Sequence, residues 1–344
     1  MRRMSFWAAL TCAAALGCGE PTTPVATTEA PTEGVEEAVT EEAATEEAAV
    51  DWAAEYQAAT EAFNAGDMEK AFATFTDDVE YTIVGLPEPI KGRAAVVELY
   101  KQQNAVLPTT VKAKRIFVTD DMWITQGVSS GTHEGEFQGV AATHNKIGND
   151  FLHMGMVKDN KTVKVMLINN TFANMTQIGA IEGEFAVPTL PTEVEVVKAE
   201  GDAARLEVLK AIYAGLEAGT WDAFDANVAE TGTHWRHDWG LAIEGSAAVK
   251  EALANAPVTE TKYDNMMIAL GDYVVVWGSY TGKATGKVGA LQGDGRQVTV
   301  PHTSVFQFKD GKIVGGETYG DPIVLIAQMK TPPATAEGDE AAPE

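Results

Sequence analysis

Residues 297–319 read QVTVPHTSVFQFKDGKIVGGETY, and this stretch decides the fold of the second half of the chain. Apolar and polar residues alternate on either side of Asp310-Gly311, which predicts strands at 297–308 and 312–319 joined by a tight turn. The Asp-Gly pair favours such a turn because the turn needs positive φ angles, which glycine adopts without steric cost. The stretch therefore predicts an antiparallel β-hairpin.

A similar hairpin pattern occurs 151 residues earlier, with strands predicted at 150–157 and 162–169 around Asp159-Asn160. The offset stays at 151 from Asp121 onward and is 153 before it, so one loop differs by two residues. Most matched positions are turn residues, whose type is dictated by backbone geometry, and we interpret the chain as a tandem duplication. The matches are Gly66/Gly219, Gly92/Gly245, Asp121/Asp272, Gly127/Gly278, Gly131/Gly282, Gly135/Gly286, Lys158-Asp159/Lys309-Asp310, Lys161/Lys312 and Gln177/Gln328.

Each copy begins with helical periodicity. In the second copy, apolar residues recur at steps of three and four from Leu206 to Leu216, before a break at Gly219. Helices followed by sequential antiparallel strands predict an α+β class, with helices packed on one face of a curved sheet. Further helices are predicted at 68–75, 94–103, 221–228 and 246–254, and further strands at 111–118, 122–128, 233–239, 261–270 and 273–281.

The first twenty residues carry a predicted export signal. Arg2 and Arg3 precede an apolar run that is shorter than the ~20 residues of a membrane-spanning helix. The run ends Ala15-Leu16-Gly17-Cys18, which resembles the lipobox of bacterial lipoproteins, and this resemblance implies lipidation of Cys18. Gly19 after the cysteine fits the sorting of such lipoproteins to the outer membrane or the periplasmic face. A plain secretory signal with an incidental Cys18 is the alternative.

Composition divides the rest of the chain. Acidic Thr/Glu/Ala/Pro-rich residues 18–49 predict a disordered tether, and residues 331–344 predict a disordered acidic tail. Two prolines in a Glu/Val-rich stretch indicate a linker. The predicted organisation is signal peptide 1–17, tether 18–49, domain 1 at 50–180, linker 181–200, domain 2 at 201–330 and tail 331–344.

The charge and the cysteines exclude several functions. The net charge of −25 leaves 37 acidic against 23 basic residues once the termini are set aside, and no basic stripe occurs, so we expect no nucleic-acid binding. Cys12 and Cys18 are the two cysteines, which excludes disulfides, thiolate metal sites and a cysteine nucleophile from the two domains. Because His234 and His237 should face opposite sides of a strand, we expect no shared metal ion.

Several strings resemble the SnoaL-like polyketide cyclase family of the nuclear transport factor 2 superfamily. They are LPEPIKGR at 86–93, GTHEGEFQG at 131–139, Thr143, Asp159-x-Lys161 and QIG at 177–179. The resemblance covers about residues 50–180 and extends more weakly over 202–330. It implies two tandem cone-shaped domains, in each of which three helices and a strongly curved antiparallel sheet enclose an apolar pocket.

The same resemblance implies catalysis by an Asp or His acid/base pair without a cofactor. In the family pattern, the Asp lies seven residues before a Gln. This position is Asp321 in the second copy and Asn170 in the first, where the amide cannot accept a proton. His237 is the expected partner of Asp321. The expected pocket residues are His234, Trp235, Trp239, Trp277, Tyr280, Tyr319, His133 and Asn170.

A structural role competes with this catalytic interpretation. Asp321 precedes Pro322 and an apolar run, which is the pattern of a helix N-cap, and Asn170 caps equally well. The predicted function is a lipid-anchored envelope protein that binds a small apolar molecule. The alternative is a cofactor-independent cyclase, isomerase or lyase that uses Asp321 and His237. The expected partners are the apolar molecule and the membrane. The sequence leaves open whether the protein forms homo-oligomers.

Overall fold

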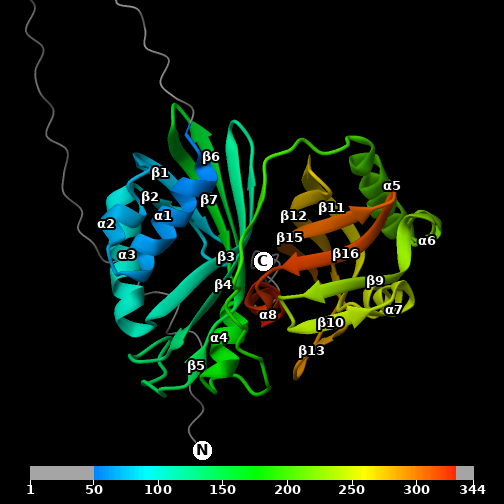
Figure 1. Ribbon diagram of the computed structural model, residues 1–344. Coiled ribbons are helices and arrows are strands. Elements are labelled where there is room, and N and C mark those ends of the chain that lie inside the picture. Colours follow the sequence, from blue (N-terminus) through cyan, green and yellow to red (C-terminus); the bar gives the residue numbers. More distant parts are fainter. Residues whose placement is uncertain (1–49, 331–344) are drawn as a thin grey trace, which may run out of the picture. The chain divides into compact units, whose positions relative to one another are not determined.

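The computed structural model describes residues 50–330, which form two curved β-sheets that each carry helices (Figure 1). The export signal, Cys18, the tether 18–49 and the tail 331–344 lie outside these residues. Among the helices of residues 50–330, none is long and apolar enough to cross a membrane.

Domain 1 begins with helices and continues into a sheet. Its elements are α1 (Trp52–Asn64), α2 (Met68–Ala71), β1 (Phe75–Ile83), β2 (Ile90–Lys91), α3 (Arg93–Val106), β3 (Thr109–Val118), β4 (Met122–Thr132), β5 (Lys146–Ile147), β6 (Asp150–Lys158), β7 (Lys161–Ile168) and α4 (Thr171–Gln177). A short strand, β8 (Glu195–Val197), follows.

Domain 2 repeats this order. Its elements are α5 (Ala204–Ala218), α6 (Asp222–Asn227), β9 (Val228–Arg236), β10 (Leu241–Glu244), α7 (Ser246–Ala254), β11 (Val258–Leu270), β12 (Tyr273–Ala284), β13 (Lys287–Val288), β14 (Leu291–Gln292), β15 (Gln297–Lys309), β16 (Lys312–Tyr319) and α8 (Pro322–Lys330).

The two sheets have the same strand order. Domain 1 has β2-β1-β7-β6-β4-β3 with β8 added at its edge, and domain 2 has β10-β9-β16-β15-β12-β11. The first long strand of each copy runs parallel to the last, β1 to β7 and β9 to β16, and the pairs between consecutive long strands are antiparallel. The identical order confirms the α+β class and the tandem repeat of one unit.

Both predicted hairpins are present. Asp159 and Asn160 have φ angles of 49° and 54°, and Asp310 and Gly311 have 51° and 76°. Two successive positive φ angles match the twist of the flanking strands, which is why these dipeptides favour the turn. Register shifts at Met156/Val157 and Gln307/Phe308 lie near these turns. Such bulges bend a strand and increase its twist, so they help to curve the sheets.

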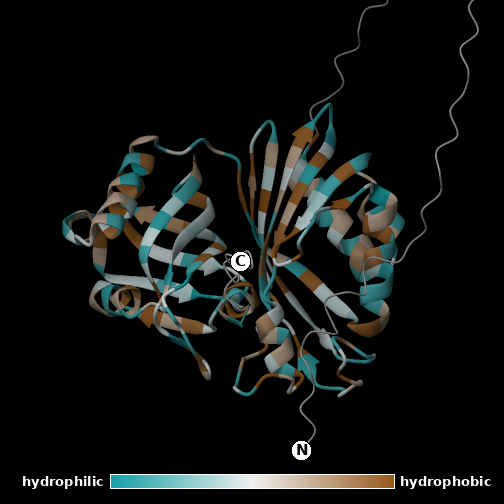
Figure 2. Ribbon diagram, turned by 180° about the vertical axis from the view of Figure 1, so that it is seen from behind, coloured by the Kyte–Doolittle hydropathy of each residue, from teal (hydrophilic) through white to brown (hydrophobic). Residues whose placement is uncertain are grey.

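Helices cover one face of each sheet. In domain 1 the core between helices and sheet contains Trp52, Phe72, Val79, Val96 and Trp123. In domain 2 the equivalent core contains Leu209, Ile212, Phe224, Val274 and Val276. Hydrophobic and hydrophilic residues alternate along many of the strands in Figure 2, as expected of strands whose two faces meet different surroundings.

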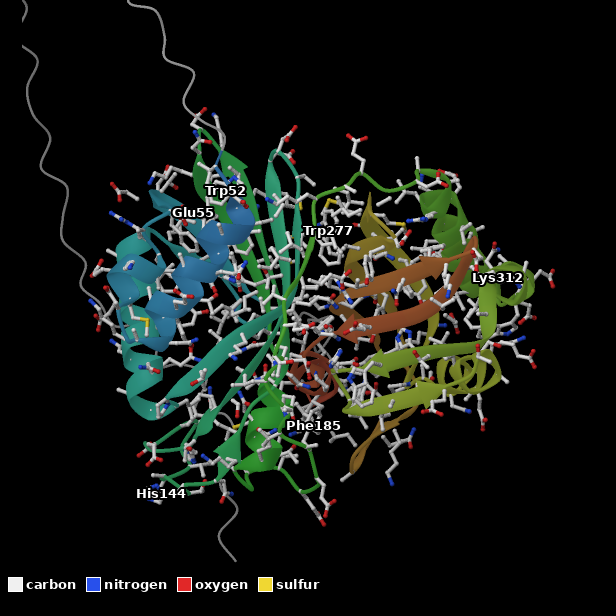
Figure 3. The ribbon with its side chains drawn as sticks, in the orientation of Figure 1. Trp52, Glu55, His144, Phe185, Trp277 and Lys312 are labelled. Atoms are coloured by element: carbon white, nitrogen blue, oxygen red, sulfur yellow. The ribbon has the colours of Figure 1, made fainter. Side chains whose placement is uncertain are left out.

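The opposite faces of the two sheets share a third core. It joins Phe117, Ile124 and Met154 of domain 1 to Val275 and Val305 of domain 2. Trp277 packs against this core, and Figure 3 shows it on the side of the domain 2 sheet that is turned away from α5. Each sheet therefore has one side that packs on its own helices and one side that packs on the other domain.

Three local expectations differ from the structure. The strand expected at 233–239 ends at Arg236, because residues 237–240 form a turn that closes at Gly240 with a φ of 64°. The helix expected at 68–75 ends at Ala71, and β1 begins at Phe75. Within the expected linker, residues 195–197 form β8 and pair with β3, because β3 would otherwise leave an open sheet edge.

Candidate functional site

Domain 2 encloses a cavity of about 770 Å³ between its helices and the concave face of its sheet. Cavities of roughly 300–1,000 Å³ that are mainly apolar and hold a few polar groups are typical of small-molecule sites. The volume is therefore sufficient for a ligand of several rings. The apolar wall includes Leu209, Ile212, Leu216, Phe224, Leu253, Val258, Val300, Phe306 and Leu325.

A buried ion pair lies in this cavity. Alternation along β9 places His234 and Arg236 on the cavity side, and Asp238 in the following turn also lines it. The guanidinium Nε of Arg236 donates to Oδ1 of Asp238 at 2.8 Å, and Nη2 donates to Oδ2 at 2.5 Å. Burial alone would lower the pKa of Arg236, but the charge and hydrogen bonds of Asp238 raise it. Arg236 is therefore permanently charged and neutralised by its neighbour.

Two histidines in the cavity are neutral. His234 Nε2 lies 2.9 Å from Oγ1 of Thr318, and His302 Nε2 lies 3.1 Å from Oδ1 of Asn265. Burial lowers the pKa of both rings to about 4, and the charge of Arg236 acts in the same direction. At neutral pH both rings offer one N–H donor and one acceptor nitrogen without a charge.

Two phenols complete the polar part of the wall. Burial raises the pKa of Tyr280 to about 12 and also raises the pKa of Tyr263, so both phenols stay neutral at physiological pH. Their rings lie 6.2 Å apart, and the ring of His302 lies 5.7 Å from that of Tyr280. The cavity thus combines an apolar body, aromatic rings, neutral hydrogen-bonding groups and one ion pair.

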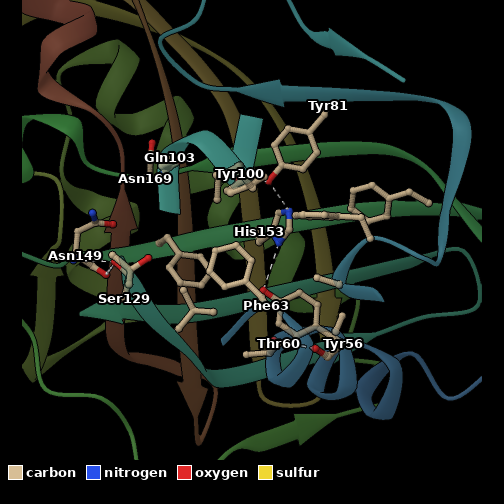
Figure 4. A pocket seen from close by; sticks show the side chains of 18 of the residues that line it. Tyr56, Thr60, Phe63, Tyr81, Tyr100, Gln103, Ser129, Asn149, His153 and Asn169 are labelled. Carbon is tan, nitrogen blue, oxygen red and sulfur yellow. Dashed lines mark hydrogen bonds between the residues drawn. The ribbon is translucent and has the colours of Figure 1, made fainter. Parts of the chain in front are cut away.

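Domain 1 encloses a smaller cavity of about 140 Å³ (Figure 4). Its wall includes Tyr56, Tyr81 and Tyr100, and the ring of His153 lies between two of these phenols. His153 Nδ1 is 3.3 Å from the hydroxyl of Tyr56, and Nε2 is 3.2 Å from that of Tyr81, which is 2.6 Å from that of Tyr100. Burial lowers the pKa of His153 to about 3, so this ring is neutral.

The other part of the domain 1 cavity is lined by amides. Asn149 donates through Nδ2 to Oδ1 of Asn174 at 3.1 Å, and Asn169 lies close by in Figure 4. Oδ1 of Asn169 is buried and has no hydrogen-bond partner among the described residues. A buried acceptor without a partner is costly, so this oxygen is a natural contact for a ligand that carries a donor.

The structure divides the residues predicted from sequence. His234, Trp239, Tyr280 and Asp321 line the domain 2 cavity. Trp235 is 43% exposed, whereas Trp277 and Tyr319 pack in the core between the sheets. His133 is buried beside Thr143, 3.0 Å from its hydroxyl, and neither it nor Asn170 lines the domain 1 cavity.

His237 lies in the turn after β9 and does not line the cavity, which corrects its expected position. Nδ1 is 3.1 Å from Oδ2 of Asp150 in domain 1, and Nε2 is 3.0 Å from Oε2 of Glu317. Its ring stacks on Tyr319 at 4.6 Å. Burial alone would lower the pKa of His237, but hydrogen bonds to the two carboxylates raise it. The turn is the physical reason, since it ends the strand at Arg236 and places the ring of His237 against Asp150 and Tyr319.

Asp321 lines the cavity but directs its carboxylate to backbone N–H groups. It accepts from Thr171 at 3.1 Å, from Phe172 at 3.2 Å and from Ile323 at 3.1 Å. Burial raises the pKa of Asp321, and these hydrogen bonds oppose the rise. The carboxylate of Asp321 therefore caps the start of α8, as the helix-capping interpretation expects. The same carboxylate also caps the start of α4 in domain 1.

Sequence reasoning missed most of the polar groups in the cavities. It placed His234 and His237 on opposite sides of a strand but did not identify the Arg236–Asp238 pair as part of a site. His302, Tyr263 and the His153 cluster gave no local pattern, because their members come from distant strands and helices. No group of three or more His, Cys, Asp or Glu side chains in residues 50–330 is placed to hold a metal ion.

A curved sheet closed by helices around an apolar cavity defines the class of cone-shaped α+β domains. Comparison with known families gives the same class and names it. Residues 53–178 match the SnoaL-like polyketide cyclase family, and residues 209–315 match the SnoaL-like domain family. The chain therefore contains two SnoaL-like domains in tandem.

Several solved structures are similar to part of the chain. IdmH, a putative polyketide cyclase from Streptomyces antibioticus, is 25% identical, with 38% of this chain and 99% of that chain covered and a TM-score of 0.35. A putative SnoaL-like polyketide cyclase from Jannaschia sp. CCS1 is 21% identical, with 37% of this chain and 92% of that chain covered and a TM-score of 0.34. An LEH-like epoxide hydrolase from M. tuberculosis is 16% identical, with 36% of this chain and 84% of that chain covered and a TM-score of 0.30. No curated protein matches the chain.

Proposed function

We propose that the protein binds a small, mainly apolar molecule in the domain 2 cavity, with the Arg236–Asp238 pair as the polar anchor. The observation that carries this proposal is the cavity of about 770 Å³ whose apolar wall contains one buried ion pair and neutral hydrogen-bonding rings. Such a wall favours a multi-ring ligand that carries a polar group, because most of the wall is apolar and the pair supplies one of its few polar contacts.

The protonation of the cavity favours binding over proton transfer. An effective general base has a pKa near the working pH, whereas the pKa of His234 and of His302 is about 4. Asp238 is held by a bidentate hydrogen bond to Arg236. These groups are suited to recognising a ligand and are poorly matched to abstracting a proton at neutral pH.

One observation favours an enzyme as the second candidate. Asp321 lines the cavity and burial raises its pKa, as general acids in apolar pockets require. The candidate is a cofactor-independent cyclase, isomerase or lyase that uses Asp321 as its ionisable group, without His237, which does not line the cavity. Turnover by the purified protein that is lost in Asp321→Asn with unchanged ligand affinity would favour this second function.

We also propose a second, smaller ligand for domain 1. A cavity of about 150 Å³ is enough for one benzene ring, and the domain 1 cavity has about 140 Å³. The unpartnered oxygen of Asn169 adds a contact for a donor on that ring. A single-ring phenol or aniline is the ligand class that fits both features.

The proposed location is the cell envelope, through a lipid on Cys18, with residues 18–49 as a tether. Fractionation of cells that express Cys18→Ala tests this part. Release from the membrane fraction is expected. Retention of the variant in the membrane fraction would contradict the lipid anchor.

Binding in domain 2 is tested with a fluorescent apolar dye, 8-anilinonaphthalene-1-sulfonate. Ala252 lines the cavity from α7, so Ala252→Trp should fill part of the space and remove one dye-binding component. Small molecules that co-purify with the wild-type protein and are absent from Ala252→Trp, measured by mass spectrometry, would then reveal the natural ligand class. Equal dye binding by both proteins would contradict a domain 2 site.

A further inference from the structure

Domain 1 holds the backbone of one wall of the domain 2 cavity. Asn170, which is 2% exposed, donates through Nδ2 to the carbonyl oxygen of His237 at 2.9 Å and to that of Asp238 at 3.0 Å. These carbonyls belong to the turn that follows β9, and Asp238 of this turn anchors the guanidinium of Arg236. A side chain of domain 1 thus fixes the turn that carries the cavity's ion pair.

The side chain of His237 fastens the same turn from its other face. It contacts Asp150 of domain 1 at 3.1 Å and Glu317 of domain 2 at 3.0 Å. Lys114 of domain 1 reaches the same Glu317 carboxylate at 2.8 Å. Because His237 lies between Arg236 and Asp238 in the chain, movement of its ring would move both cavity residues.

Two further contacts join domain 1 to the cavity wall. Asp321 lines the cavity and accepts the backbone N–H groups of Thr171 and Phe172 at the start of α4. The ring of Phe172 lies 6.0 Å from that of Trp239, another cavity residue. The contacts from domain 1 thus reach the turn at 237–240 and two residues outside it, Glu317 and Asp321.

We propose that domain 1 is a positioning partner for the ligand site of domain 2 and that Asn170 is the main positioning residue. This inference rests on the proposed binding of a ligand in the domain 2 cavity. Asn170 suits the role because its amide oxygen caps α4, accepting from Ala173 at 2.9 Å, while its amide nitrogen supplies two donors to the turn. An ionised aspartate, as at position 321, has no donor for the carbonyls.

Asn170→Ser separates these two roles. Serine caps a helix about as well as asparagine but does not reach the carbonyls of His237 and Asp238 with two donors. We expect the dissociation constant of the domain 2 dye component, defined as the component that Ala252→Trp removes, to rise at least about five-fold in Asn170→Ser, the low end of typical coupling between sites. Phe172→Leu, which removes the ring contact with Trp239, should weaken the same component with the α4 cap intact.

The control is Asp67→Ala, which removes the side-chain cap of α2 at Lys70, away from the turn. It should lower the denaturation midpoint and leave the dissociation constant unchanged, so a general loss of stability is separated from positioning. Because coupling between sites is reciprocal, the dye should also slow hydrogen exchange at the amides of Thr171 and Phe172 in the wild type. That protection should be absent in Ala252→Trp.

The outcomes separate the two proposals. A domain 2 dye component with the wild-type dissociation constant in both Asn170→Ser and Phe172→Leu overturns the positioning role and leaves the proposed binding intact. If Ala252→Trp removes no dye-binding component that the wild-type protein shows, the proposed binding is overturned, and the positioning role with it.

Discussion

Asn170 and Asp321 occupy equivalent positions 151 residues apart, and each hydrogen-bonds to the backbone of the other's domain. Asn170 begins α4 and donates to the turn after β9, whereas Asp321 begins α8 and accepts the first N–H groups of α4. The carboxylate lies at the positive end of a helix, and the amide lies against two carbonyls. Each residue type matches the groups it faces, so the difference between the two copies follows from their contact.

Loss of the Asp321 carboxylate should destabilise the protein more than loss of a surface cap. Asp321→Ala leaves three N–H groups without their acceptor, and a buried group without a partner costs about 1–3 kcal/mol, so we expect a loss of at least about 2 kcal/mol. Asp51→Ala removes the exposed cap of α1 and should cost less, because water can replace the lost acceptor. Urea denaturation at pH 7 compares the two variants. Equal losses of stability would contradict the stabilising role of the Asp321 carboxylate.

His237 should make stability fall as the pH rises above neutral. Its folded-state pKa is raised by Asp150 and Glu317, so its contribution is complete below about pH 6.5, its unfolded value, and is lost as the pH passes the folded-state pKa. Each unit of the rise corresponds to about 1.4 kcal/mol. Denaturation from pH 6 to 9 should show this loss in the wild type and not in His237→Gln. The same slope in both proteins would exclude His237 as its source.

His153, in contrast, should make stability fall as the pH drops below neutral. Its folded-state pKa is about 3, so the unfolded chain takes up a proton first as the pH falls below about 6.5, and stability declines by up to about 1.4 kcal/mol per pH unit until the folded ring is protonated. His153→Gln should lose stability less steeply between pH 6 and 4, measured by urea denaturation. A variant as acid-sensitive as the wild type would contradict this prediction.

The Arg236–Asp238 pair should show strong coupling in a double-mutant cycle. Arg236→Met leaves the carboxylate of Asp238 buried without its partner, which costs about 3–5 kcal/mol for pairs of this kind. Arg236→Met/Asp238→Leu replaces the whole pair with apolar groups and should recover most of that loss, while still weakening dye binding in the cavity. Additive losses in denaturation midpoints would show that the pair is solvated.

Gly316 should tolerate no side chain because it faces the ring of His234. A methyl group on Gly316 would overlap Nδ1 of His234, and overpacking of this kind costs about 1–3 kcal/mol. Gly315→Ala is the matched control, since the nearest atom to its added methyl group is 3.7 Å away. Thermal denaturation should show a lower midpoint for Gly316→Ala than for Gly315→Ala. The reverse order would mean that His234 is free to move.

The sequence by itself determined the elements and their repetition. Alternating residues around Asp159-Asn160 and Asp310-Gly311 specify hairpins locally, since turn geometry and strand periodicity depend on neighbours within a few residues. The tandem register of turn glycines and the likeness to SnoaL-like domains were readable for the same reason. The N-cap pattern at Asp321 was also visible, because capping is a local hydrogen bond.

Only the tertiary structure decided which face of β9 lines the cavity and which face is turned toward domain 1. Period-two alternation separates Arg236 and Asp238 from His237 but does not say which set meets the helices. That choice depends on the domain 1 sheet, which shares a core with Tyr319 and Trp277 and contacts His237 through Asp150. The cavity groups from distant strands, His302 above all, were hidden in the sequence because their proximity exists only after the sheet has curved.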